Sequence, residues 1–501
     1  MKFTKSISYT LLTVALLSVG CTKDFESLNT PPTSVTTIDP ALLLARTLRD
    51  AVFSQSGESA NNKFGSWIQH WAGGPVVPGS RYIASAEDNI WDQHYAYIKN
   101  LTQIRKELLG QEETSQGRTK LAIAEIFEVY VWQQFTDLFG DIPYSEVSKT
   151  VEALNRTPKF DTQEFIYKDL ILRLNSAMEK LNSADASYGS ADFFYAGNSQ
   201  LWAKFANSLK LRLGMRMRYV NAELAKKTVI EVVQSNKGLL SSNAENAAVP
   251  TFNNAQAENY NPMLRQMVTG SSDLRYLANT LVNTLKNIQD PRLPLIVQPA
   301  VNSVGGASPN YQGIGVALTD SELAPIVRAN YSTASTQTWF SATFTPIPVF
   351  ALTFSEVSFF KAEAALLGWG YNANQAQGFF EEGVKAAFSI APYNIANVPA
   401  AYLEQQVSLA GLSDEQQLAR IQTQKWIHLF GRNMEAFSEW RRTQFPKLTP
   451  GTNKGSTDGQ IPRRAIYSTK EEQLNTVNYA EAVKRMQNGD SFISKVWWDK
   501  K

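Results

Sequence analysis

Cys21 is the residue whose chemistry is most clearly set by its position in the chain. It is the only cysteine, and it follows Lys2, Lys5 and an apolar stretch from Ile7 to Val19. A positive start, a short apolar run and small residues before a processing point are typical of a secretory signal peptide. The run is too short to span a bilayer, which needs about 20 residues. The string LLSVGC therefore predicts that the thiol accepts a lipid, as in a bacterial lipobox; the alternative is an ordinary signal peptide with an incidental cysteine.

The other reactive residue types give no pattern for catalysis or for metal binding. His70, His94 and His428 are the only histidines, and none has metal-ligand spacing to another suitable side chain. We expect each to be structural or on the surface. Asp137 and Asp141 could form a carboxylate pair for glycoside hydrolysis only if they lie close in space, and we interpret them as turn residues at a helix end. No catalytic residue, cofactor or metal is predicted.

Aromatic and arginine side chains gather in two segments without helical periodicity, residues 71–89 and 299–348. A loop as long as the second is uncommon in a compact domain unless it is functional or disordered, and its aromatic residues argue against simple disorder. Both segments are therefore candidate binding sites, although core packing is a competing interpretation for every residue in them. The predicted ligand-binding residues are Trp71, Arg81, Tyr82, Tyr311, Tyr331 and Trp339.

The charge balance limits the kind of partner that the protein can have. The chain has 48 basic and 46 acidic residues, and removal of Lys2 and Lys5 with the signal peptide makes it formally neutral. Nucleic-acid binding needs a strong basic excess, so no nucleic-acid partner is predicted. With one cysteine, the chain has no internal disulfide, and the fold must rest on its core.

Apolar residues recur with helical spacing along most of the chain, so we expect a mainly α fold. Strand signals are few, and Leu293 to Val297 could form at most a minor hairpin. Arg212, Arg216, Arg441 and Arg442 are interpreted as a solvated or salt-bridged helix face rather than a binding patch. The predicted helices cover residues 41–54, 118–139, 163–182, 199–220, 222–235, 273–288, 355–369, 373–390, 413–431 and 470–487.

One helix pair has the spacing of a tetratricopeptide-like repeat. Phe360, Ala364 and Leu367 on one helix and Phe380 and Gly383 on the next match the small and aromatic positions of that repeat. No clean second copy is visible, so any further repeats have diverged. The predicted organisation is a signal peptide over residues 1–20, a lipidated tether over 21–37 and one large helical body with long irregular loops over 38–501.

Several strings in order resemble the SusD/RagB family of Bacteroidota outer-membrane nutrient-binding lipoproteins, in its SusD-like subfamily. The most specific runs from Thr136 to Glu146, TDLFGDIPYSE, and the resemblance extends over nearly the whole chain. Lys23-Asp24 resembles the acidic export signal of surface lipoproteins in that phylum. Other matching strings are Trp91-x3-Tyr95, Trp202 to Arg212, Asp290-Pro-Arg292, Lys361 to Ala364, Gln424 to Ile427, Glu439 to Thr443 and Val496 to Asp499.

The resemblance implies a non-catalytic protein with about four tetratricopeptide-like helix pairs. It implies a lid-like partner of a SusC-type TonB-dependent transporter, to which the protein delivers a glycan captured from the medium. The protein would be held at the outer membrane by its lipid, facing the cell surface. In this family loop aromatics stack on sugar rings, which corresponds loosely to the two irregular segments.

Three other functions stay open at this point. The ligand could be a peptide or another non-glycan nutrient carried by the same kind of transporter complex. The protein could be an anchored glycosidase, which would need a close carboxylate pair in a cleft. It could also be a scaffold whose helix pairs bind only proteins.

Overall fold

A computed structural model describes residues 38–72, 78–147, 155–185, 187–252, 256–263, 265, 276–303, 309–339 and 346–501. The chain divides into two units, Met1–Asp39 and Pro40–Lys501. Cys21, the predicted signal peptide and the predicted tether lie outside the described residues. The second unit contains all the elements discussed below.

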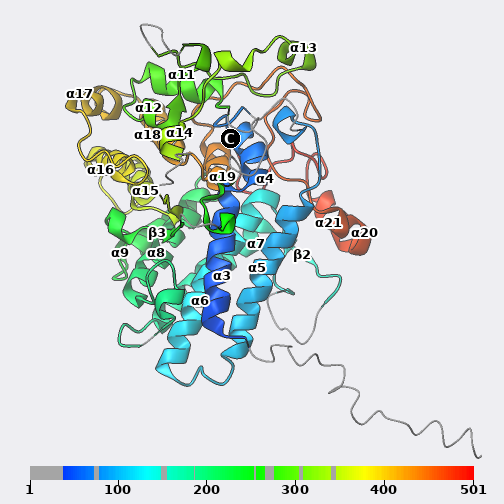
Figure 1. The fold of residues 1–501 in the computed structure, drawn as a ribbon. Helices are drawn as coiled ribbons and strands as arrows, with labels where there is room; N and C mark the ends of the chain where they lie inside the picture. The colour runs from blue at the N-terminus through cyan, green and yellow to red at the C-terminus, as the bar shows by residue number, and fades with distance from the viewer. Residues whose placement is uncertain are drawn as a thin grey trace, which may run out of the picture. The chain divides into compact units, whose positions relative to one another are not determined.

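The second unit is mainly α-helical, which confirms the fold class expected from the periodicity (Figure 1). In the residues that the structure describes, strands form three short antiparallel pairs: β1 (Ile142–Pro143) with β2 (Phe160–Asp161), β3 (Ala247–Val249) with β6 (Val349–Leu352), and β4 (Val297–Gln298) with β5 (Thr333–Ala334). The helices are α3 (Pro40–Phe53), α4 (Glu58–Ala60), α5 (Asp88–Glu107), α6 (Ser115–Phe139), α7 (Gln163–Lys180), α8 (Ser199–Arg216), α9 (Ala222–Gln234), α11 (Asn279–Asn287), α12 (Leu293–Ile296), α13 (Asp320–Leu323), α14 (Thr336–Trp339), α15 (Phe354–Leu366), α16 (Ala376–Ser389), α17 (Ala400–Tyr402), α18 (Asp414–His428), α19 (Asn433–Thr443), α20 (Thr469–Leu474) and α21 (Thr476–Lys484).

Local capping explains where the long helices begin and end. The side chains of Thr114, Thr162 and Asn198 accept backbone N–H groups in the first turns of α6, α7 and α8, which satisfies donors that a helix start leaves free. Gly140 ends α6 with a φ of 83°, a conformation that glycine adopts without strain. The helix predicted over residues 470–487 is divided into α20 and α21, a break that periodicity alone does not reveal, whereas the one predicted over 413–431 is a single helix that ends at His428.

The predicted helix pair at residues 360–383 is present as α15 packed against α16. A Cβ atom at Gly383 would lie 2.8 Å from the Phe359 ring and 3.2 Å from the Ser355 carbonyl oxygen. The two helices therefore approach so closely that only glycine fits at this crossing. Helices α6 and α7, α8 and α9, and α3 and α5 pack together in the same neighbour-to-neighbour way.

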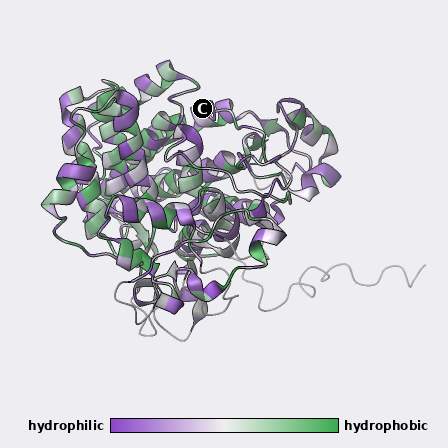
Figure 2. Ribbon diagram, turned by 90° about the horizontal axis from the view of Figure 1, so that it is seen from above, coloured by the Kyte–Doolittle hydropathy of each residue, from purple (hydrophilic) through white to green (hydrophobic). Residues whose placement is uncertain are grey.

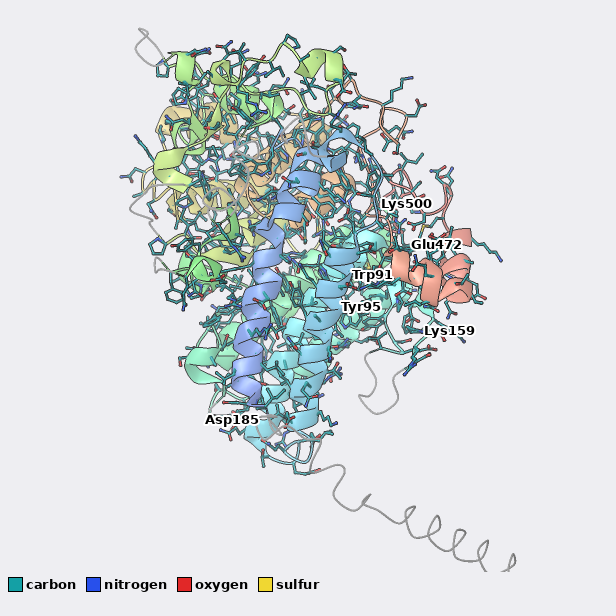
Figure 3. All side chains as sticks on the ribbon, turned by 45° about the vertical axis from the view of Figure 1, so that its right-hand side comes forward. Trp91, Tyr95, Lys159, Asp185, Glu472 and Lys500 are labelled. Carbon is teal, nitrogen blue, oxygen red and sulfur yellow. The ribbon has the colours of Figure 1, made fainter. Side chains whose placement is uncertain are left out.

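Hydrophobic and hydrophilic residues alternate along these helices, as the hydropathy colouring shows (Figure 2). The apolar sides meet in aromatic contacts such as those of Trp91 and Tyr95, one turn apart on α5 (Figure 3). The Trp91 ring lies 4.9 Å from Phe135 of α6 and 5.5 Å from Tyr467, measured between centroids. Among the described helices, none has the length and apolar character needed to cross a membrane.

A buried network of ion pairs connects helices α8, α15, α18 and α19. Its basic members are at most 6% exposed and its acidic members at most 4%, measured over their side chains. Each charge is paired, as a charge removed from water requires. The pairs are Arg212–Glu356 (2.8 Å), Arg432–Glu356 (3.0 Å), Arg216–Glu435 (2.6 Å), Arg216–Glu439 (2.8 Å), Lys425–Glu439 (2.7 Å) and Arg442–Glu363 (2.7 Å).

This network corrects the interpretation of the arginines as a solvated or salt-bridged helix face, because the salt bridges are present but lie in the interior. Arg212 and Arg216 are salt-bridged, but to carboxylates of other helices in the interior. Arg441 is also buried, and donates to the backbone carbonyls of Asp137 and Arg463. A sequence shows the arginines of one helix, whereas their burial depends on partners far along the chain.

We predict that Glu363→Gln strongly destabilises the fold. Glu363 accepts two 2.7 Å hydrogen bonds from Arg442, one from Gln422 and one from Arg218. Loss of its charge leaves the buried Arg442 guanidinium with Glu439 as its remaining counter-ion, and Glu439 is also shared with Arg216 and Lys425. The expected loss in the free energy of unfolding is about 3–5 kcal/mol, measured by urea denaturation. Glu381→Gln is the matched control, because its pair with Lys385 is an exposed one within a single helix and should contribute about 0.5 kcal/mol or less. Equal losses in the two variants would contradict the prediction.

We also predict that the network makes the fold sensitive to acid. Burial by itself would raise the pKa of Glu363, but the ion pair with Arg442 overcomes this and lowers the pKa to about 2. A carboxylate whose pKa is lower in the folded state stabilises the fold above its unfolded pKa of about 4.3 and loses this contribution as the pH falls toward 2. The urea midpoint should therefore drop between pH 5 and pH 2, and less steeply in Glu363→Gln. Parallel pH profiles for the two proteins would exclude Glu363 as a source of the effect.

Candidate functional site

The two irregular segments are each joined by single backbone bridges to residues 276–278, which lie outside both of them. Trp71 pairs with Leu277, Tyr276 with Thr333, and Ala278 with Ile314. Strand β4, which ends just before the second segment, pairs with β5 inside it. Segments far apart in the sequence are thereby placed next to one another, and the predicted site residues follow their backbones.

Trp71 and Trp339 belong to one aromatic cluster. The Trp71 ring stacks on Phe430 at 5.1 Å between centroids, and Trp339 meets the same Phe430 edge-on at 5.5 Å. The two tryptophans are only 2% and 7% exposed, so most of each ring faces protein. Their indole N–H groups are buried without a hydrogen-bond partner.

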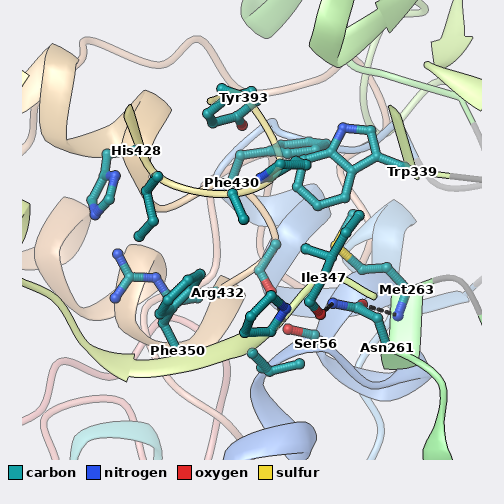
Figure 4. A pocket seen from close by; sticks show the side chains of 16 residues that line it. Ser56, Asn261, Met263, Trp339, Ile347, Phe350, Tyr393, His428, Phe430 and Arg432 are labelled. Atoms are coloured by element: carbon teal, nitrogen blue, oxygen red, sulfur yellow. Dashed lines mark hydrogen bonds between the residues drawn. The ribbon is translucent and has the colours of Figure 1, made fainter. Parts of the chain in front are cut away.

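A small cavity adjoins this cluster (Figure 4). Trp339, Phe430 and Tyr393 line it on one side, and His428 and Arg432 lie on the side away from Trp339. The cavity encloses about 40 Å³. A volume of this size has room for water and not for a sugar ring.

The polar residues of the small cavity are held by the surrounding fold. Burial, with Arg432 nearby, lowers the pKa of His428 well below its usual range, so the ring is neutral at pH 7. Its Nε2 lies 2.8 Å from the Thr353 hydroxyl, and Arg432 is paired with Glu356. These groups belong to the interior network and are not available for proton transfer to a ligand.

A second cavity, of about 130 Å³, lies where residues 80–81 approach the segment from Ile314 to Arg328. Its walls are polar and apolar in equal share, because Ser80, Arg81, Tyr276 and Arg328 line it together with several aliphatic side chains. Trp71 belongs to the aromatic cluster, whereas the next residue, Ala72, lines the second cavity. The Trp71–Ala72 backbone therefore contributes to both places.

Arg81 is the predicted site residue that lines the second cavity. Its Nη2 lies 2.8 Å from a carboxylate oxygen of Asp320, at the start of α13. The Arg81 side chain is 19% exposed and that of Asp320 87%, so this ion pair lies at the surface and contributes little to stability. The Nε of Arg81 is buried without a hydrogen-bond partner.

Tyr82 lies in the core behind Arg81. Its ring has no exposed surface, and burial raises its pKa to about 12. Its hydroxyl accepts a hydrogen bond from the Gly451 N–H, and its carbonyl accepts one from the Ser456 N–H. In this conformation Tyr82 offers no ring face for stacking and instead holds the turn that carries Arg81.

Tyr311 and Tyr331 are each half-buried. The two chain segments that carry them run side by side. The neighbours Gln312 and Ser332 are joined by two hydrogen bonds, from Ser332 N to the Gln312 carbonyl (2.7 Å) and from Gln312 N to the Ser332 hydroxyl (2.9 Å). Burial raises the pKa of Tyr311. These two rings, unlike the two tryptophans, keep substantial surface in contact with solvent.

The carboxylates considered for hydrolysis have structural roles. Asp137 is buried and accepts a 2.9 Å hydrogen bond from the Trp498 indole. Asp141 caps the start of α7 by accepting the Gln163 N–H at 2.9 Å and pairs with Arg485 at 2.6 Å. All three histidines are buried, in agreement with a structural role. In the part of the chain that the structure describes, no group of three or more His, Cys, Asp or Glu side chains could hold a metal ion.

Sequence reasoning missed several residues that line the two cavities. Tyr276, Leu323 and Ile326 line the second cavity, and Phe430 and Arg432 line the first. An aromatic residue such as Tyr276 is visible in the sequence, but its partner segments are not. Phe430 and Arg432 follow a helix that looked purely structural, so no local signal distinguished them.

Comparisons with known proteins agree on one family. Residues 32–468 match the SusD-like family model described as "Starch-binding associating with outer membrane". A solved chitin-binding protein is 28% identical, with 92% of this chain and 100% of that chain covered and a TM-score of 0.76. A SusD homolog from Bacteroides uniformis is 27% identical, with 93% and 100% covered and a TM-score of 0.76. No curated protein gives a significant match.

A chitin-binding SusD homolog from Flavobacterium johnsoniae shares the fold at 24% identity and a TM-score of 0.74, over 92% of this chain and 98% of that one. The family match covers most of the chain, including every irregular segment described above. The resemblance found in the sequence motifs is thereby confirmed: the chain belongs to the SusD-like family.

Proposed function

We propose that the protein is a surface lipoprotein that binds a glycan and delivers it to a SusC-like TonB-dependent transporter. SusD-like proteins are carbohydrate-binding proteins and not enzymes. The similar structure at 28% identity is a chitin-binding protein, which supports a glycan over a peptide. The observation that carries the proposal is the second cavity, which is lined by the guanidiniums of Arg81 and Arg328, the half-buried Tyr276 and several aliphatic side chains.

The six predicted residues divide by exposure into two proposed roles. Arg81, Tyr311 and Tyr331 present surface and would contact the glycan directly. Trp71, Tyr82 and Trp339 are almost fully buried and would hold the bridged segments in place. Shallow stacking of a sugar on an aromatic ring contributes only about 0.5–1.5 kcal/mol beyond area burial, which suits a protein that must release its ligand to a partner.

The anchor and the partner are proposed on the N-terminal sequence and the family. Lipid on Cys21 would hold the protein at the outer membrane, facing the cell surface, through the tether that ends near Pro40. The family description names association with the outer membrane. Since one acyl chain binds membranes only marginally, a multiply acylated cysteine or the transporter contact would be needed for stable attachment.

We predict that the chain without its first 21 residues binds a glycan in isothermal titration calorimetry against polysaccharides, oligosaccharides and peptides. Arg81→Ala should weaken binding about tenfold to a hundredfold, because a hydrogen bond to a charged group contributes about 1.5–3 kcal/mol. Tyr331→Ala should weaken it about two- to tenfold. Arg118→Ala is the matched control, since Arg118 is exposed at the start of α6. Binding of peptides alone would show that the ligand is not a glycan.

We predict that Cys21→Ala releases the full-length protein from the outer membrane. Without the thiol, no lipid can be attached, and the protein should move from the membrane fraction to the soluble fraction on cell fractionation. The described unit begins after residue 37, so its melting temperature should not change. Retention of Cys21→Ala in membranes, with the transporter deleted, would argue against the lipid anchor.

A further inference from the structure

Two guanidiniums line the second cavity. Arg81 comes from the first irregular segment and Arg328 from the second. Among the described residues that line this space, none carries a carboxylate. Two like charges beside one small volume leave a positive potential in it, which attracts an anion and repels a cation. The cavity therefore favours a negatively charged group over an amine.

The acidic residues of α13 do not belong to the lining, and both already have partners. Asp320 lies 2.8 Å from Arg81 Nη2, and its side chain is 87% exposed. A pair at the surface is weak, and one carboxylate cannot occupy all five N–H donors of a guanidinium. Glu322 accepts hydrogen bonds from the hydroxyls of Thr319 and Thr452. The positive potential of the cavity is therefore compensated only in part.

The rest of the lining increases the attraction for an anion. Ser80 and Tyr276 contribute hydroxyl groups to its polar half. Its apolar half is aliphatic and includes the buried Ile314 and Ala317 and the half-buried Leu323. Because apolar walls exclude water, the attraction between an ion and a guanidinium is screened less here than on an open surface.

The volume of the cavity suits a small oxyanion. It encloses about 130 Å³, and a cavity of roughly 150 Å³ is known to hold a benzene ring. A carboxylate or sulfate group fits in this space, whereas a whole sugar residue does not. The planar fork of a guanidinium also matches the paired oxygens of such groups. A glycan bound here would insert a charged substituent and keep its rings outside.

We propose that the second cavity binds the oxyanion of an acidic sugar, either the carboxylate of a hexuronate or a sulfate ester. Arg81 and Arg328 donate to its oxygens, and the aliphatic wall shields these contacts from water. This assignment rests on the proposed function as a glycan-binding protein, and it adds the charge class of the glycan. A plain hydroxyl at the same position forms hydrogen bonds but leaves the two positive charges uncompensated.

The test is calorimetric titration of the chain lacking its first 21 residues with glycans in matched pairs that differ only in charge. The acidic members are polygalacturonate, alginate, chondroitin sulfate and a sulfated galactan, and each is compared with its methyl-esterified or desulfated form. At least one acidic glycan should bind about tenfold or more tightly than its neutralised form, because a site that binds a substituent rejects an analogue that lacks it. Added salt should reduce this preference by screening. The pair that shows the preference distinguishes a carboxylate from a sulfate.

Variants locate the preference at the cavity. Arg81→Gln and Arg328→Gln should each reduce it to about threefold or less, and Arg118→Gln, which changes an exposed arginine of α6, should keep it. Arg328→Glu should favour the neutralised glycan, because it places a negative charge at the cavity. If Arg81→Gln lowers the melting temperature, the two Arg328 variants remain informative, since Arg328 is exposed. An unchanged preference in both of them would overturn the site.

The other outcomes separate this proposal from the function on which it rests. Equal affinity within every pair, or tighter binding of the neutral members, would overturn the oxyanion site and leave glycan capture standing. Silence toward all glycans, acidic and neutral, would overturn both proposals. Binding of an acidic peptide such as polyaspartate, without binding of any glycan, would also overturn both, because the ligand would then not be a sugar.

Discussion

The fold depends on the rule that a charge removed from water must be paired. Arg216 contacts Glu435 and Glu439, and Glu439 in turn pairs with Lys425 and Arg442. Such shared partners fix α8, α18 and α19 relative to one another, because shifting one helix by a turn would leave several buried charges without their partners. The apolar packing of the helix pairs supplies most of the burial, and the ion pairs determine which arrangement of those helices is allowed.

The sequence predicts the helical frame well and the network poorly. Apolar periodicity and capping residues such as Thr162 and Asn198 are signals that extend over only a few neighbouring residues. Most helix positions could therefore be predicted directly from the sequence. Glu363 and Arg442 lie on different helices, and nothing near either residue shows that they meet. The same difference explains why Arg212 and Arg216, which look like an exposed basic face, are interior residues in the structure.

The two segments of the candidate site could be predicted from the sequence, but not how their side chains are arranged in space. Loop length and aromatic content drew attention to residues 71–89 and 299–348, and the family resemblance indicated sugar recognition as their proposed role. Bridges such as Trp71 to Leu277 decide which side chains face a cavity and which are buried. Phe430 covers a face of the Trp71 ring and contacts Trp339 edge-on, so both tryptophans are buried. Tyr276, which lines the second cavity, lies outside both segments, and its neighbours in space come from elsewhere in the chain.

The isolated bridges of the irregular segments have a consequence for how this protein family can diversify. A residue in a helix pair constrains its partners over a whole interface, whereas residues 309–339 are held in part by backbone contacts that do not depend on the side chain, although Gly313 has no room for a Cβ atom. Substitutions there can reshape the recognition surface while the charged interior stays unchanged. The segment is therefore a natural unit for exchange between relatives, by recombination or in the laboratory, to give one scaffold new nutrient preferences.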